Sequence, residues 1–212
     1  MRTFSFLLTS FILAASVTSC ASDAISVAPT IVFKTGLIEN GALTVPKGKN
    51  IFVGMMIYDG RGREMPFFRS QVEWKSDDYN VLQLTPLGNT SMITGVSDWF
   101  DAPTLDHEPT TKYTVTYHDL TLNVPVHVTV NIAGTWQISV DNKPPTELIL
   151  DQHGHDILTG VATVIGHLDK NNVTLAQNEA TLIGTLSSRT AAAGTYTAPD
   201  GAHGAWTAAK RP

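Results

Sequence analysis

Residues 121–132 read Thr-Leu-Asn-Val-Pro-Val-His-Val-Thr-Val-Asn-Ile, and this stretch decides the fold class. Every second residue from Leu122 to Ile132 is aliphatic, whereas the residues between them are polar or proline. Successive side chains of a strand point to opposite faces, so the pattern predicts one buried face and one solvated face, as in an antiparallel sandwich. Pro125 has no N–H group to donate, so we expect it at a sheet edge or at a bulge.

The same alternation recurs from Thr30 onward, and no segment has the periodicity of an amphipathic helix. The preceding strand, residues 112–118, places Tyr113, Val115 and Tyr117 on one face, and His118-Asp119 joins the two strands as a hairpin. Further strand-like stretches lie upstream, at residues 43–49, 51–58, 72–84 and 93–96. The sequence therefore predicts an all-β chain.

A more specific pattern lies between residues 72 and 96. A strand that contains Trp74 leads into the turn Ser76-Asp77-Asp78, and the short strand 81–84 and the glycine-containing strand 93–96 follow. This order resembles a bacterial Ig-like domain of the Big type. The resemblance implies an Ig-like antiparallel β-sandwich over residues 30–132, with Trp74 in its core. The segment from Asp98 to Thr111 is longer and more polar than the usual connection in that family.

A second unit is expected over residues 133–212. Its short strands are rich in Thr and Gly and lie at residues 136–140, 147–150, 158–165, 180–186, 194–197 and 204–207. They predict a small antiparallel β-meander or open barrel of five or six strands. Gly-x-Trp occurs at both ends and faintly resembles lipocalin and avidin barrels, although about 79 residues is short for eight strands. We expect Trp136 and Trp206 to be core residues.

The N-terminus has the features of an export signal. Arg2 precedes an uncharged, mostly apolar run that is too short to span a bilayer as a helix. Val17-Thr18-Ser19-Cys20 resembles the lipobox of bacterial lipoproteins. The resemblance implies that residues 1–19 are a signal peptide, that lipid is attached to Cys20, and that its new amine is acylated, with palmitate as an expected chain. Residues 20–29 then form the lipidated cysteine and a tether. The alternative is an ordinary signal peptide, cut after Ala21 or Ala24, with Cys20 discarded.

The residue after the cysteine bears on location. Ala21 stands where an aspartate would favour retention in the inner membrane, so the resemblance implies the outer membrane. Cys20 is the only cysteine, which excludes an intramolecular disulfide. Removing residues 1–19 takes away Arg2 and no acidic residue, leaving 13 basic and 19 acidic side chains and a net charge of −6. The charges are spread, which argues against a nucleic-acid partner and against adsorption to anionic lipid through charge alone.

No motif of a catalytic or metal centre occurs, so the sequence predicts no catalytic residue, no metal site and no cofactor. The group His153-Gly154-His155-Asp156 is interpreted as a solvated turn. A second group, in the segment from Asp98 to Glu108, is interpreted as a solvated acidic loop. Within that loop, Trp99 and Phe100 are the candidate partner contacts, because adjacent aromatic residues cannot both face one core. They could equally cap the open end of the sandwich.

The favoured function is a non-enzymatic, lipid-anchored protein of the cell envelope that serves as a binding, adhesion or structural module. Its expected partners are the membrane, through the lipid on Cys20, and an envelope protein or glycan. The alternative is a periplasmic inhibitor or small-ligand binder that acts through the C-terminal unit. An apolar cavity lined by Leu158, Val161 and Ile165 would favour that alternative. A hydrolase whose residues converge only in space is the third hypothesis.

Overall fold

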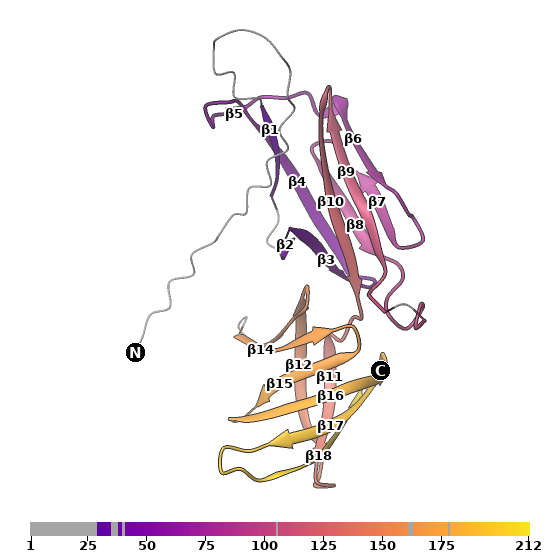
Figure 1. The fold of residues 1–212 in the computed structure, drawn as a ribbon, viewed down its shortest axis with the longest axis vertical. Helices are drawn as coiled ribbons and strands as arrows, with labels where there is room; N and C mark the ends of the chain where they lie inside the picture. The colour runs from indigo at the N-terminus through magenta and orange to yellow at the C-terminus, as the bar shows by residue number, and fades with distance from the viewer. Residues whose placement is uncertain (1–28, 35–37, 40, 105, 161–162, 178) are drawn as a thin grey trace.

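A computed structural model describes residues 29–34, 38–39, 41–104, 106–160, 163–177 and 179–212. It confirms the prediction of an all-β chain. Strands between Thr30 and Thr129 build two packed sheets, and strands between Gly134 and Lys210 build a closed barrel (Figure 1). No helix among these residues is long and apolar enough to cross a bilayer, and η1 (Arg69–Gln71) is a single short turn.

The first sheet of the sandwich has the order β1-β4-β8-β7, and β5 pairs with β4. The bounds of these strands are β1 (Thr30–Lys34), β4 (Asn50–Tyr58), β5 (Glu64–Met65), β7 (Leu82–Pro86) and β8 (Thr90–Gly95). All pairings in this sheet are antiparallel. The strand β4 runs the full length of the sandwich, from the barrel at Asn50 to the opposite end at Tyr58 (Figure 1).

The second sheet has the order β2-β3-β10-β9-β6. Its strands are β2 (Ile38–Glu39), β3 (Ala42–Pro46), β6 (Val72–Ser76), β9 (Thr110–Tyr117) and β10 (Leu120–Thr129). The pairing of β10 with β3 is parallel and starts at Val126, one residue after Pro125. At Pro125 the strand is therefore paired only with β9, so this part of β10 lies at the sheet edge, as expected for a proline. From Val126 onward β10 lies inside the sheet.

The sandwich core lies between the two sheets. The alternating residues of β10, namely Leu122, Val124, Val126 and Val128, are all at most 3% exposed, as the sequence pattern predicts. Trp74 is 7% exposed and stacks on Phe33 and Tyr113, at ring centroid distances of 6.2 and 5.5 Å. Its indole N–H donates to the Gly88 carbonyl oxygen at 2.8 Å. Trp74 is thus a core residue, as expected.

The barrel has eight strands and is closed, so the expectation of five or six strands was wrong. The strands follow chain order, each pairs with the next in antiparallel orientation, and β11 closes the barrel on β18. Their bounds are β11 (Gly134–Val140), β12 (Thr146–His153), β13 (Asp156–Thr159), β14 (Thr163–Asp169), β15 (Asn172–Gln177), β16 (Ala180–Ser188), β17 (Ala191–Thr197) and β18 (His203–Lys210).

Tight turns allow so short a chain to form eight strands. Asp141, Asn142 and Lys170 adopt positive φ angles of 50°, 58° and 56° at the β11–β12 and β14–β15 turns. Such residues close two-stranded hairpins with few residues outside the ladder. The run 158–165, expected to be one strand, is divided between β13 and β14 near Gly160, which has a φ angle of 54°.

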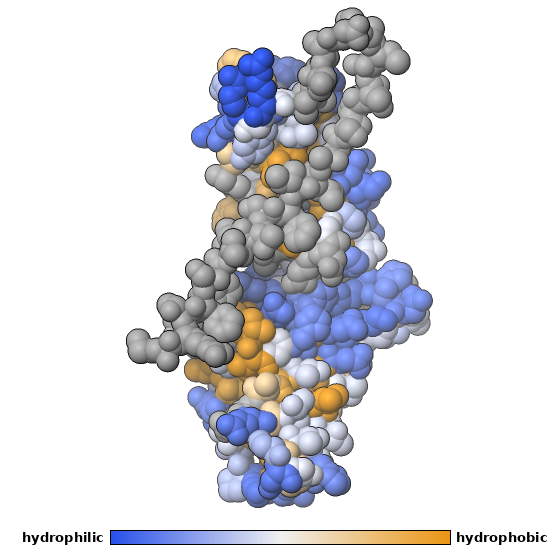
Figure 2. Space-filling model, turned by 60° about the vertical axis from the view of Figure 1, so that its left-hand side comes forward, coloured by the Kyte–Doolittle hydropathy of each residue, from blue (hydrophilic) through white to orange (hydrophobic). Residues whose placement is uncertain are grey.

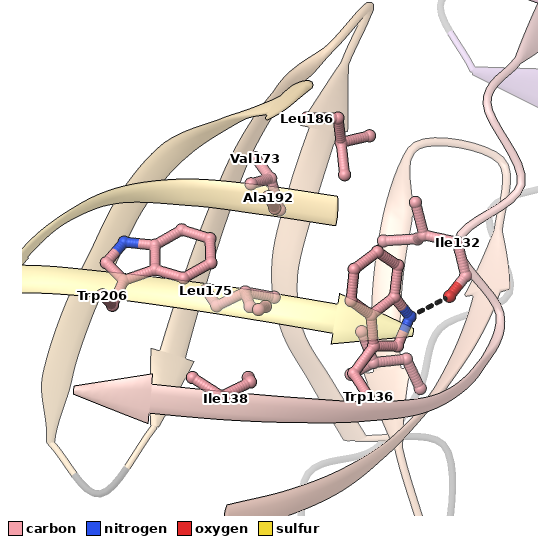
Figure 3. Close-up of a pocket in the computed structure, with 10 residues that line it drawn as sticks. Ile132, Trp136, Ile138, Val173, Leu175, Leu186, Ala192 and Trp206 are labelled. Atoms are coloured by element: carbon pink, nitrogen blue, oxygen red, sulfur yellow. Dashed lines mark hydrogen bonds between the residues drawn. The ribbon is translucent and has the colours of Figure 1, made fainter. Parts of the chain in front are cut away.

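Side chains fill the interior of the barrel, as is usual for eight strands. Trp136 and Trp206 are each 2% exposed and, as expected, are core residues. They lie at different depths along the barrel, on the neighbouring strands β11 and β18 (Figure 3). The Trp136 N–H donates to the Ile132 carbonyl oxygen at 2.7 Å. The Trp206 N–H lies 3.2 and 3.1 Å from the carbonyl oxygens of Ile183 and Thr195.

Candidate functional site at the junction of sandwich and barrel

The link between the two units is short and buried. Strand β10 ends at Thr129 and β11 begins at Gly134. Val130 and Ile132, which lie between them, are at most 1% exposed and pack with the core of the barrel. The alternation of aliphatic and polar residues that begins in β10 of the sandwich therefore ends in the core of the barrel.

Gln152 connects the link to the barrel. This residue of β12 is 0% exposed, so each of its polar atoms requires a partner within the protein. Its Oε1 accepts a hydrogen bond from the Ile132 amide at 2.9 Å, and its Nε2 lies 3.0 Å from the Val130 carbonyl oxygen and 3.1 Å from Thr129 Oγ1. Nearby, Lys49 of the sandwich donates to the Gln152 carbonyl oxygen at 2.7 Å and pairs with Asp151.

Trp99 and Phe100 lie on the loop that follows β8. Both are partly buried and pack against the barrel core rather than within the sandwich core. Lys170 Nζ lies 5.9 Å from the Trp99 ring centroid, and the Arg189 guanidinium lies 5.7 Å from that of Phe100. These distances are in the range of cation–π contacts. The two candidate partner contacts therefore lie within the junction.

The two aromatic residues are flanked by an ion-pair network. Arg189, which follows β16, makes two hydrogen bonds to the Asp98 carboxylate at 2.8 and 2.7 Å and a third to Asp101 at 2.6 Å. Asp101 also pairs with Lys47. Asp98 is 0% exposed, so the interpretation of this segment as a solvated loop was wrong for Asp98. A buried carboxylate needs such a charged partner.

The network changes the pKa of its members. Burial acts to raise the pKa of Asp101, but hydrogen bonds from Lys47, the Asp98 amide and Arg189 outweigh it and hold the pKa well below its ordinary value of 3.8. The hydrogen bonds to Asp98 and Asp101 raise the pKa of Arg189 above its ordinary value, against the effect of burial. Both shifts favour the charged forms, so the network is an ion pair at any physiological pH.

A second cluster surrounds Glu108, at the other end of the loop. Glu108 is 5% exposed, and its carboxylate lies 3.0 Å from His155 Nε2 and accepts the Lys170 amide at 3.2 Å. The His155 ring also packs on His167 at a centroid distance of 5.4 Å. The interpretations as solvated residues were therefore wrong for Glu108 and for His155, whose side chain is 19% exposed. Among the described residues, no group of three or more His, Cys, Asp or Glu side chains is arranged to hold a metal ion.

His127 of β10 belongs to the same cluster. Burial lowers the pKa of His127 below its ordinary value of 6.5, and the charges of His155 and His107 act in the same direction. Glu108 opposes them. A histidine whose pKa is lower in the folded state favours folding when neutral. Its contribution is fully present above about pH 6.5 and is lost as the pH falls towards the folded value.

We expect the stability of the protein to decline in two acid steps. The first begins below pH 6.5, where His127 is protonated more readily in the unfolded chain. The second begins below pH 3.8, because Asp101 has a depressed pKa and stabilises only while ionised. Urea unfolding across this pH range measures both steps. His127→Gln should flatten the first step and Asp101→Asn the second, and a variant that leaves its step unchanged would contradict the assignment.

The barrel interior bears on the ligand-binding alternative. A cavity lies between the core side chains and has a volume of about 20 Å³, close to the space of one water molecule. Its lining is apolar and includes Trp136, Leu175, Leu186 and Trp206, which point towards one another in Figure 3. Leu158 and Ile165 do not line it, and Val161 lies outside the described residues. The described interior is therefore a packed core, which counts against a small-molecule site.

The junction can fix one unit on the other, and its chemistry is that of a structural interface. Hydrophilic residues cover much of the visible surface where the units meet, and hydrophobic residues gather on the barrel just below it (Figure 2). Cys20, the predicted lipidation site, lies outside the described residues. Sequence reasoning missed Arg189 and Gln152, because each lies far along the chain from the residues that it binds.

Comparisons with known proteins give structural similarities alone. No protein family matches the chain, and no characterised sequence matches it. The structure of domains 5–6 of the S-layer protein SbsC is 15% identical, with 86% of each chain covered and a TM-score of 0.35. The structure of SbsC domains 1–6 is 17% identical over 85% of this chain and 21% of that chain, with a TM-score of 0.39. The chain spans about half the length of the structure of SbsC domains 4 and 5, at 18% identity and a TM-score of 0.35.

Proposed function

We propose that the protein is a lipid-anchored, non-enzymatic module of the bacterial cell envelope, in which a Big-type sandwich carries the barrel as one rigid body. The observation that carries the proposal is the junction. Asp98, Glu108 and Gln152 are at most 5% exposed and are satisfied by partners contributed across the boundary between the units. Buried polar groups of this kind fix one orientation, because any other would leave them unpaired.

A fixed orientation suits a spacer or a presenting module. The cavity of about 20 Å³ is too small for an organic ligand, which supports this proposal over the small-ligand alternative. The exposed surface of the barrel then remains available for an envelope protein or glycan. This surface is rich in threonine and carries the exposed apolar residues Ile149, Val164 and Ile183.

The anchor is tested by Cys20→Ser. We expect the variant to lose radiolabelled palmitate and to move from the membrane fraction to the soluble envelope fraction, because one cysteine carries the whole lipid attachment. Gln83→Ser, at an exposed residue of β7 in the folded sandwich, is the control and should keep both the label and the membrane association. Unchanged labelling and unchanged fractionation of Cys20→Ser would rule out the lipid anchor.

Rigidity is tested separately. Spin labels on one introduced cysteine in β5 and one in β17 should give a single narrow distance distribution in residues 21–212, from which Cys20 is left out so that only these two thiols react. The double replacement Asp98→Asn and Arg189→Leu should broaden it, since the ion pair across the junction is removed. A broad distribution in the unaltered chain would contradict the rigid-body proposal.

A further inference from the structure

The end of the sandwich opposite the barrel presents an unusual combination of residues. We call it the tip and define it as residues 59–69, 86–88 and 117–119, which include strand β5, the first residue of η1 and the turn between β9 and β10 (Figure 1). Three large apolar side chains are exposed there: Phe68 at 73%, Leu87 at 50% and Met65 at 39%. Exposed apolar side chains gathered at one place indicate a binding surface.

The exposed side chains stand on an ordered base. Phe67 packs edge-on against Tyr117 at a centroid distance of 5.7 Å, and the Phe68 amide donates to the Tyr117 hydroxyl at 3.4 Å. The Arg69 side chain lies against Gly88, which follows Leu87 in the β7–β8 turn. Arg69, which follows Phe68, thus packs beside the turn that carries Leu87. The contacts of Phe67 and of the Phe68 amide fix the backbone at this place, so the outward direction of the Phe68 side chain is a feature of the folded structure.

Two arginines of the tip lack carboxylate partners. Arg63 pairs with Asp59, Arg189 with Asp98 and Asp101, and Arg211 with Glu147. Among the described arginines, Arg61 and Arg69 make no ion pair, and both are exposed. The exposed carboxylates of Glu64 and Asp119 balance the formal charge of the tip, so the two guanidinium groups themselves, and not a net positive charge, match anionic groups above an apolar layer.

The chain enters the fold at the same end. Thr30, the first residue of β1, pairs with Tyr58, which directly precedes the tip turn at residues 59–63. Residues 21–29 reach at most roughly 30 Å when fully extended. If Cys20 carries the lipid, the tip is therefore held next to the bilayer, and the barrel lies at the far end of β4.

We infer that the tip is a membrane-contact surface, in which Phe68, Leu87 and Met65 enter the headgroup layer and Arg61 and Arg69 bind anionic lipid headgroups. The inference rests on the proposed anchor at Cys20. The tether converts docking into an intramolecular step at high effective concentration, so a small surface is sufficient. Because the chain is acidic overall, it does not adsorb to a membrane through charge alone. Burial of the apolar side chains adds the binding free energy that the two arginines do not provide.

The mature chain makes a direct test possible, since Cys20 is its only thiol. Residues 20–212 are coupled through Cys20 to a maleimide phospholipid in vesicles of phosphatidylethanolamine and phosphatidylglycerol. Phe68 is replaced by the photo-crosslinking residue p-benzoylphenylalanine. A matched variant carries the same residue in place of Ile183, which is 57% exposed on β16 of the barrel. Both sites are exposed, so neither replacement disturbs a core, and melting curves verify that each variant is folded.

After irradiation, mass spectrometry should find at least about tenfold more lipid adduct at position 68 than at position 183, because only the tip enters the interface. Equal yields at the two positions, or no adduct at position 68, would overturn the inference. Replacing phosphatidylglycerol with phosphatidylcholine should lower the yield at position 68 several-fold, and an unchanged yield would refute the role of the arginines. Since the tether is chemical, these results do not depend on whether the cell lipidates Cys20, which the palmitate experiment decides separately.

Discussion

Replacing Arg189 with leucine should lower the free energy of unfolding by about 2–3 kcal/mol, less than the cost of removing one partner of a fully buried ion pair, because solvent screens the partly exposed guanidinium. The variant would leave the Asp98 carboxylate, which is 0% exposed, without its two hydrogen bonds from the guanidinium. Arg189 itself is 41% exposed at its side chain, so the cost arises mainly from Asp98. Urea denaturation at neutral pH, extrapolated to water, measures the change.

Two further variants are the controls for this result. Asp98→Asn combined with Arg189→Leu should be more stable than Arg189→Leu alone, since no uncompensated charge remains buried. Lys49→Ala removes the more exposed ion pair with Asp151 in the same junction and should cost no more than about 1 kcal/mol. If Arg189→Leu behaved like Lys49→Ala, the ion pair would not hold the junction together.

Replacing Trp206 with alanine should cost about 3–5 kcal/mol, as large-to-small substitutions of buried aromatic residues do. Trp206 is 2% exposed, and its indole lies close enough to β16 that a Cβ atom at Gly184 would be 2.6 Å from it. No neighbouring backbone can move into the space, because β16 and β17 already approach each other closely at Gly184 and Gly194. The cavity would therefore remain and add to the loss of buried surface.

We expect the barrel of Trp206→Ala to unfold before the sandwich, which gives two transitions in place of one. Circular dichroism detects the two transitions, and hydrogen exchange measured by mass spectrometry assigns each one, because peptides of the sandwich and of the barrel are followed separately. The control is Ile183→Ala on the same barrel, where the side chain is 57% exposed and the change should be within about 0.5 kcal/mol. A single transition with an unchanged midpoint in Trp206→Ala would contradict the role of this tryptophan in the core.

The sandwich could be predicted because its long strands carry a strict pattern. Six aliphatic residues alternate from Leu122 to Ile132, and each is buried in the structure. Trp74 could also be assigned to the core from its place before the Ser-Asp turn. Such strands have one buried face, and that face is visible in the residue types.

The number of strands in the barrel could not be predicted from the sequence in the same way. Asn172–Gln177 forms β15, but only Val173 and Leu175 mark its inner face, and so short a pattern resembles a polar loop. In the run 158–165 only Thr159 and Thr163 are polar, so the sequence gives little sign of the division that occurs near Gly160. Short strands with small outward residues carry little periodicity.

The junction was beyond sequence reasoning for a different reason. Asp98 and Arg189 are separated by 91 residues, and neither belongs to a motif. Acidic loops are usually solvated, so Asp98 and Glu108 could be assigned to the interior only once the barrel was known to cover them. Trp99 and Phe100 were identified as unusual, but their neighbour in space is the second unit of the same chain.

The position of Thr30 beside Tyr58 has a mechanical consequence. A load applied between the start of β1 and the barrel would enter the sandwich at the tip through β1 and leave it at the opposite end through β10, which continues into the barrel. The pull is then directed along the strands, at right angles to the hydrogen bonds between them. These bonds share the load and must break together, whereas bonds peeled from one end break singly. Under tension, the sandwich is therefore loaded in its stronger direction.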